Sequence, residues 1–70
     1  MKYLIVIEST KTGFSAYSPD VPGCFATGAS REEAERTMRD ALAFHVDALR
    51  DVGLEIPKPH ASSAYVDVPA

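Results

Sequence analysis

Four acidic residues, Glu8, Asp20, Asp40 and Asp47, are the side chains that could build a metal-dependent nuclease. Two-metal catalysis needs several carboxylates that converge on ions about 4 Å apart. Glu8 stands at the end of an apolar run beside a turn, and Asp40 and Asp47 lie about two helical turns apart on a mostly polar face. We interpret all four as solvated surface acids and predict no metal site. A metal-dependent nuclease stays open as an alternative.

His45 and Cys24 are the other candidates for chemistry. A histidine that acts as a general base needs a nucleophile and an orienting acid within hydrogen-bond reach, and the sequence identifies neither for His45. Reactive cysteines lie at helix N-termini or beside cations, whereas Cys24 follows a turn and precedes Phe25. We therefore predict a hydrogen-bonded core or interface histidine and a buried thiol. No catalytic residue, cofactor or enzymatic activity is expected.

Hydropathy and turn signals place these residues on a short series of elements. The segment 3–7 is a continuous apolar, β-branched run, typical of a strand buried on both faces. The predicted helix begins with a Ser30-x-x-Glu33 capping box and ends at Gly53. The predicted elements are strands over 3–7, 14–18 and 24–27, a helix over 31–52, an extended linker over 56–60 and a final strand over 64–68. This order, β-β-β-α-β, predicts a small α+β domain with an antiparallel-rich sheet and the helix packed on one face.

The stretch 18–24 is a rigid bend between two of these strands. Pro19 and Pro22 fix φ near about −65° and push the preceding residues toward extended geometry. Gly23 can take the positive φ that a tight turn often requires. The bend can be a structural turn and nothing more, or a rigid support for a surface that binds another protein. Both interpretations stay open at this point.

A hairpin followed by Pro19-Asp20-x-Pro22-Gly23-Cys24, then a glycine and a capped helix, resembles the HicB-type antitoxin family from Tyr3 to Val68. The resemblance implies a reduced ribonuclease H-like fold in the N-terminal, partner-binding domain of a type II toxin–antitoxin protein. It also implies a partner, a small basic HicA-type toxin that cleaves messenger RNA and is neutralised by steric occlusion. Many family members continue into a DNA-binding segment, but no such segment follows the last predicted strand in this sequence. We therefore expect residues 1–70 to be one HicB-like domain without a separate DNA-binding domain.

The predicted partner-binding residues surround the bend. They are Phe14, Tyr17, Asp20, Pro22 and Phe25. Aromatic side chains on a rigid support are the usual anchors of protein interfaces. An acidic side chain that faces a basic partner contributes to steering more than to affinity.

The size of the chain favours an oligomer. A chain of 70 residues buries only about 60% of the surface that it exposes when unfolded, so a monomer is marginally stable. One cysteine excludes an internal disulfide, and the histidines match no zinc spacing. The first predicted strand is apolar on both faces, and a single helix can bury only one of them. We therefore expect a homo-oligomer, dimer or tetramer, and a homo-oligomeric scaffold or ligand-binding module without a toxin is an alternative function.

The net charge of −3 disfavours direct nucleic-acid binding, because that activity favours a basic patch. The helical arginines are interleaved with acids, as on an ordinary solvated face. No apolar run approaches the roughly 20 residues of a membrane span. We expect a cytoplasmic protein without membrane contact.

Overall fold

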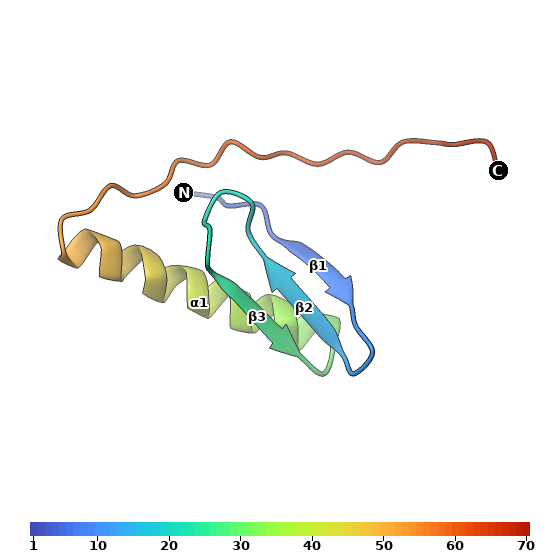
Figure 1. Ribbon diagram of the computed structural model, residues 1–70, viewed down its shortest axis with the longest axis horizontal. Helices are drawn as coiled ribbons and strands as arrows, with labels where there is room; N and C mark the ends of the chain where they lie inside the picture. The colour runs from blue at the N-terminus through green and yellow to red at the C-terminus, as the bar shows by residue number, and fades with distance from the viewer.

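The computed structural model describes all residues from 1 to 70 and contains a three-stranded antiparallel sheet with one helix across a single face (Figure 1). The strands lie side by side in the order β1-β2-β3. The elements are β1 (Val6–Ser9), β2 (Phe14–Tyr17), β3 (Phe25–Gly28) and α1 (Arg31–Asp51). The predicted α+β class and the order β-β-β-α are confirmed.

The hairpin of β1 and β2 closes with a hydrogen bond from the Thr10 backbone amide to the Gly13 carbonyl oxygen, at 2.7 Å. Side chains of a strand alternate between the two faces of a sheet. The register pairs Ile7 with Ala16, and Ala16 with Ala26, on the face that α1 covers. Both alanines are buried, so β2 and β3 each present a small side chain to the helix at this pair.

The bend between β2 and β3 consists of two successive turns. The Val21 amide donates to the Ser18 carbonyl oxygen at 3.2 Å, and the Cys24 amide donates to the Val21 carbonyl oxygen at 3.3 Å. Gly23 takes a φ of 82°, as predicted. Val21 points into the core and is 1% exposed, which ties the middle of the bend to the rest of the domain.

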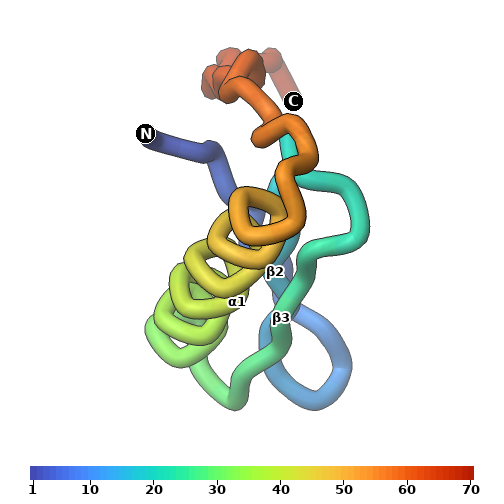
Figure 2. Tube along the Cα trace, turned by 90° about the vertical axis from the view of Figure 1, so that its left-hand side faces the viewer, coloured from blue at the N-terminus to red at the C-terminus, as the bar shows by residue number.

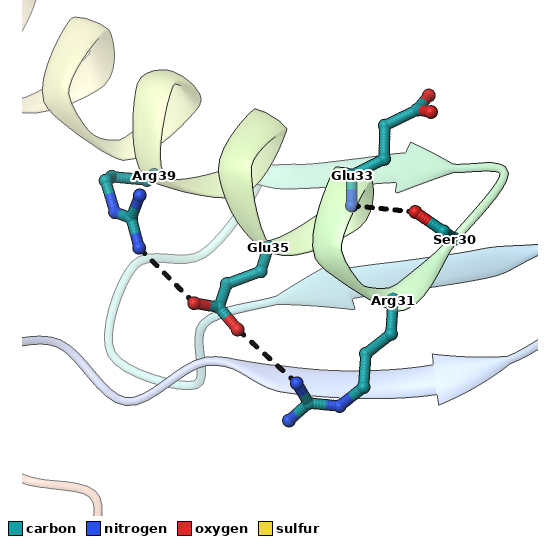
Figure 3. A network of polar contacts seen from close by, with 5 residues as sticks. All are labelled: Ser30, Arg31, Glu33, Glu35 and Arg39. Atoms are coloured by element: carbon teal, nitrogen blue, oxygen red, sulfur yellow. Dashed lines mark hydrogen bonds and ion pairs between the residues drawn. The ribbon is translucent and has the colours of Figure 1, made fainter.

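The helix begins where the sequence predicts. The Ser30 hydroxyl oxygen accepts a hydrogen bond from the Glu33 amide at 3.1 Å, which satisfies one of the free amides of the first turn (Figure 3). The Glu33 carboxylate points away from Ser30, so only one half of the capping box forms. At the other end Val52 is the C-cap, and Gly53 follows with a φ of 75°.

The core lies between the sheet and α1 and is small. Met38 is its largest fully buried helical side chain, and Ala34 is equally buried. A Cβ atom at Gly28 would lie 2.5 Å from the backbone nitrogen of Ala34, so a side chain there would push the helix away from β3. The buried apolar residues are Ala16, Val21, Cys24, Ala26, Ala34, Met38 and Leu42. This small number of buried side chains is consistent with the marginal stability that the length of the chain predicts for a monomer.

The second and third predicted strands agree with β2 and β3 to within one residue at each end, whereas the first and the last differ more. The first begins at Val6 rather than Tyr3, because its partner β2 ends at Tyr17, opposite Val6, where the chain enters the bend. The segment 64–68 forms no strand at all, so the predicted final β element is wrong for the single chain. It is extended, but no strand of this chain pairs with it (Figure 1).

The last residues instead form a tail, 54–70, that leaves the end of α1 and runs past the sheet without joining it (Figures 1 and 2). The radius of gyration is 13.9 Å, whereas a compact chain of this length has about 11 Å. The tail accounts for this expansion, because the other elements pack together. The predicted extended linker at 56–60 is confirmed as its first part.

Candidate partner-binding surface

The face of the sheet opposite α1 carries an apolar row. Val6 pairs with Tyr17, and Tyr17 pairs with Phe25, so these three side chains stand next to one another on that face. Tyr17 is 44% exposed and Phe25 is 72% exposed. We call Val6, Tyr17 and Phe25 the outer row. Large exposed aromatic side chains held on paired strands are suited to anchoring a protein partner.

Pro22 lies in the bend that joins β2 to β3, three residues before Phe25. It is exposed, next to Gly23 and close in sequence to the start of β3. Two turn hydrogen bonds and the buried Val21 side chain fix this part of the backbone. A surface that is already ordered loses little conformational entropy when a partner binds.

Phe14 and Asp20 do not lie on the outer row with which the sequence analysis grouped them. Phe14 faces α1 and packs, half-buried, against the core, because it lies an odd number of positions from Tyr17 on β2. The Asp20 carboxylate accepts hydrogen bonds from the Ala61 amide, at 3.2 Å to Oδ1 and 3.1 Å to Oδ2. The structure therefore places Tyr17 and Phe25 side by side but puts Phe14 on the other face. It leaves Pro22 exposed in the bend, and it engages Asp20 with the tail.

The acidic residues and the histidine that were candidates for catalysis or metal binding do not lie close together. Glu8 and Asp40 are exposed on different elements, and Asp47 pairs with Arg50 at 3.1 Å on the surface of α1. No three His, Cys, Asp or Glu side chains are grouped as the ligands of a metal ion would be. His45 is half-buried and makes no side-chain hydrogen bond within the chain, so the predicted bond is missing.

Cys24 is buried, as predicted. Its removal from water raises the pKa of the thiol, because the thiolate is poorly solvated there. The thiol is thus held in its unreactive form.

A second surface, which the sequence did not reveal, is a groove of about 790 Å³ between the free edge of β1, one flank of α1 and the tail. We call it the β1 groove. Its floor is formed by the N-terminal segment 3–7, and its helical wall includes Leu42, Val46 and three arginines. Two of these arginines, Arg31 and Arg39, bond the carboxylate of Glu35 between them (Figure 3).

No helix of the chain combines the length and the apolar character that a membrane span needs. The fold and the outer row together define a small α+β domain whose sheet face opposite α1 is open and partly aromatic.

Comparison with known proteins identifies the family. Residues 3–70 match the HicB-like antitoxins of bacterial toxin–antitoxin systems, and the chain belongs to that family. It is 37% identical over 71 residues to antitoxin HicB 2 of Photorhabdus laumondii, and 35% identical over 69 residues to an uncharacterised 14.9 kDa protein of Haemophilus phage HP1.

These alignments cover 100% and 99% of this chain, but 51% and 52% of the two relatives. The chain thus spans about half the length of these curated relatives. A solved structure of a HicA3 and HicB3 toxin–antitoxin complex is also similar. It has a TM-score of 0.72 and 35% sequence identity over 86% of this chain and 70% of the matched one.

Proposed function

We propose that this chain binds and sterically neutralises a small HicA-type toxin that cleaves messenger RNA. The observation that carries the proposal is the likeness, in both fold and sequence, to a chain in a HicA3 and HicB3 complex. Membership of the HicB-like antitoxin family supports the same function. In this mechanism the chain makes and breaks no covalent bonds, because covering the active site of the toxin is sufficient. A partner that cleaves messenger RNA acts in the cytoplasm, so we propose that the two proteins bind there.

The outer row is the surface that we assign to the toxin. Tyr17 and Phe25 offer exposed aromatic area on paired strands, and Pro22 is exposed on the fixed bend that joins these strands. The net charge of −3 favours the approach of a basic partner through long-range attraction. Phe14 supports this surface from beneath the sheet, and Asp20 orders the tail beside the bend.

The test measures how tightly the full chain binds a purified HicA-type toxin and whether it neutralises that toxin. We expect Phe25→Ala and Tyr17→Asp each to raise the dissociation constant at least about tenfold, as buried aromatic anchors do. Both should also restore messenger RNA cleavage at antitoxin concentrations that otherwise prevent it. Phe44→Ala is the matched control, because Phe44 is 78% exposed on α1, away from the outer row.

Lack of binding by the unmodified chain would overturn the proposed function. Unchanged binding by both outer-row variants, with binding by the unmodified chain intact, would instead remove Tyr17 and Phe25 from the interface.

A further inference from the structure

The segment that leads into β1 is a strand edge without partners. Tyr3, Leu4 and Ile5 are half-buried and extended, and their backbone amides and carbonyls make no hydrogen bond within the chain. β1 continues this segment at the border of the sheet, because only β2 pairs with it. Unpaired backbone groups along such an edge can pair with a strand of any other chain, which leads to aggregation.

The side chains of this edge strengthen that tendency. The segment 3–7 combines high β-propensity with no charge, no proline and no glycine. Short segments of this composition stack into aggregates when they are exposed. Proteins protect an edge with lysine, proline or a bulge in the strand, or with a loop or helix that covers it. The segment has neither lysine nor proline, and the pairing of β1 with β2 is regular, so only a cover can protect it.

The tail lies beside this edge. Its residues Ser63, Ala64 and Tyr65 form one wall of the β1 groove, and the segment 3–7 of the same chain forms the floor. Figures 1 and 2 show the tail running past the start of the chain without entering the sheet. A strand of another chain would have to enter the groove that the tail borders, so the position of the tail decides how accessible the edge is.

Two contacts hold the tail in this position. The Tyr3 hydroxyl donates a hydrogen bond to the Pro57 carbonyl oxygen, and the Asp20 carboxylate accepts from the Ala61 amide with both oxygens. The anchored part of the tail is itself a poor strand, because Pro57 and Pro59 have no amide hydrogen. It can therefore shield the edge without presenting a second continuous edge of the same kind.

We infer that the tail is an intramolecular guard, which keeps the segment 3–7 from pairing with other chains as long as Tyr3 and Asp20 hold it. Release of the tail makes the protein aggregate through this edge. The inference does not rest on the proposed toxin binding, because the outer row lies on a face of the sheet and the guarded backbone groups lie along its border. It concerns open-ended stacking of strands and not a closed oligomer of fixed size.

The first experiment releases the tail of the full chain. The double variant Tyr3→Phe, Asp20→Ala removes both anchoring hydrogen bonds and retains the aromatic ring that packs against the core. At high micromolar concentration we expect a lag before thioflavin T fluorescence and light scattering rise that is several-fold shorter than in the unmodified chain. Thr37→Val, Asp40→Ala is the matched control, because it removes one hydroxyl and one carboxylate from exposed positions of α1 and should leave the lag unchanged.

The second experiment separates release of the tail from a loss of stability. Ser30→Ala weakens the N-cap of α1 but leaves both anchors in place, so it should aggregate no faster than the unmodified chain. Leu4→Lys, added to the released double variant, should restore the lag, because a lysine on an edge opposes pairing. Leu4 is suited to this change because it is not among the residues that pack against the core. Circular dichroism and denaturant titration verify the fold and the stability of each variant.

Hydrogen exchange of the Ala61 amide reports whether the tail is released. Three outcomes would overturn the guard. They are an unchanged lag in a double variant whose Ala61 amide exchanges freely, an equally short lag in Ser30→Ala, and a lag that Leu4→Lys does not lengthen. An Ala61 amide that stays protected in the double variant would show that the two hydrogen bonds are not the anchors, which also contradicts the proposal.

Discussion

The carboxylate of Asp20, in the bend between β2 and β3, holds the backbone amide of Ala61, which lies 41 residues later in the chain. A hydrogen bond to a charged acceptor contributes more than one between neutral groups. This contact, with that of Tyr3 to Pro57, is what gives the tail a defined direction. The bend is therefore both the border of the outer row and the attachment point of the tail.

Replacing Asp20 should release the tail without unfolding the domain. In Asp20→Ala the Ala61 amide loses its acceptor, and we expect its hydrogen exchange to approach that of a free amide, with a stability loss on the order of 1 kcal/mol. Asp40→Ala is the matched control, since Asp40 is exposed and makes no side-chain hydrogen bond. Unaltered protection of Ala61 in Asp20→Ala would contradict the assigned contact.

Met38 should dominate the stability of the core. It is 0% exposed and is the largest side chain that is fully buried. Met38→Ala removes its contacts and leaves a cavity, so we expect a loss of about 2–5 kcal/mol in the free energy of unfolding. In a domain with so small a core, this loss is enough to leave much of the population unfolded. Denaturant titration measures it, and Phe44→Ala, at an exposed site, should stay within about 0.5 kcal/mol of the unmodified chain.

The N-cap of α1 should contribute less than Met38 to the free energy of unfolding, and its contribution can be measured separately. Ser30→Ala removes the acceptor of the Glu33 amide and should lower the free energy of unfolding by about 1 kcal/mol. Ser30→Asp keeps an acceptor and adds a negative charge at the helix N-terminus, so it should retain most of the stability. Equal losses in the two variants would show that the cap hydrogen bond is not the cause.

Cys24 should make stability depend on pH in the alkaline range. Burial raises the pKa of its thiol in the folded state above its ordinary value near 9.0. The folded state therefore holds the proton more tightly than the unfolded state, and this contribution is fully present below pH 9 and is lost as the pH rises above it. Stability should fall more steeply above pH 9 in the unmodified chain than in Cys24→Ala, in denaturant titrations at several pH values. Parallel curves for the two would contradict the assigned burial effect.

Local signals in the sequence were sufficient for most of the fold. Ser30 and Gly53 mark the two ends of the helix because capping depends on neighbouring backbone groups alone. Gly23 marks the bend for a similar reason, since few other residues take a positive φ. The antitoxin family could also be inferred from the bend and the capped helix together, and the match over residues 3–70 confirms it.

The composition of the candidate binding surface could be predicted only in part from the sequence. Residue type indicated exposed aromatic anchors, and Tyr17 and Phe25 are indeed exposed neighbours. Phe14 was grouped with them, but strand parity places it on the opposite face, under the helix. Nothing in the local sequence of Asp20 indicated that its carboxylate would bind the Ala61 amide.

The amino-acid sequence by itself determined the helix limits, the turns and the family, because these depend on interactions between residues that are close along the chain. The tertiary structure alone decided which side chains share a face, that the segment 64–68 finds no strand partner in its own chain, and that a groove remains open beside β1. Such properties arise from strand register and from contacts between distant residues, and the free energy of these contacts depends on the whole packed arrangement rather than on any short stretch of sequence.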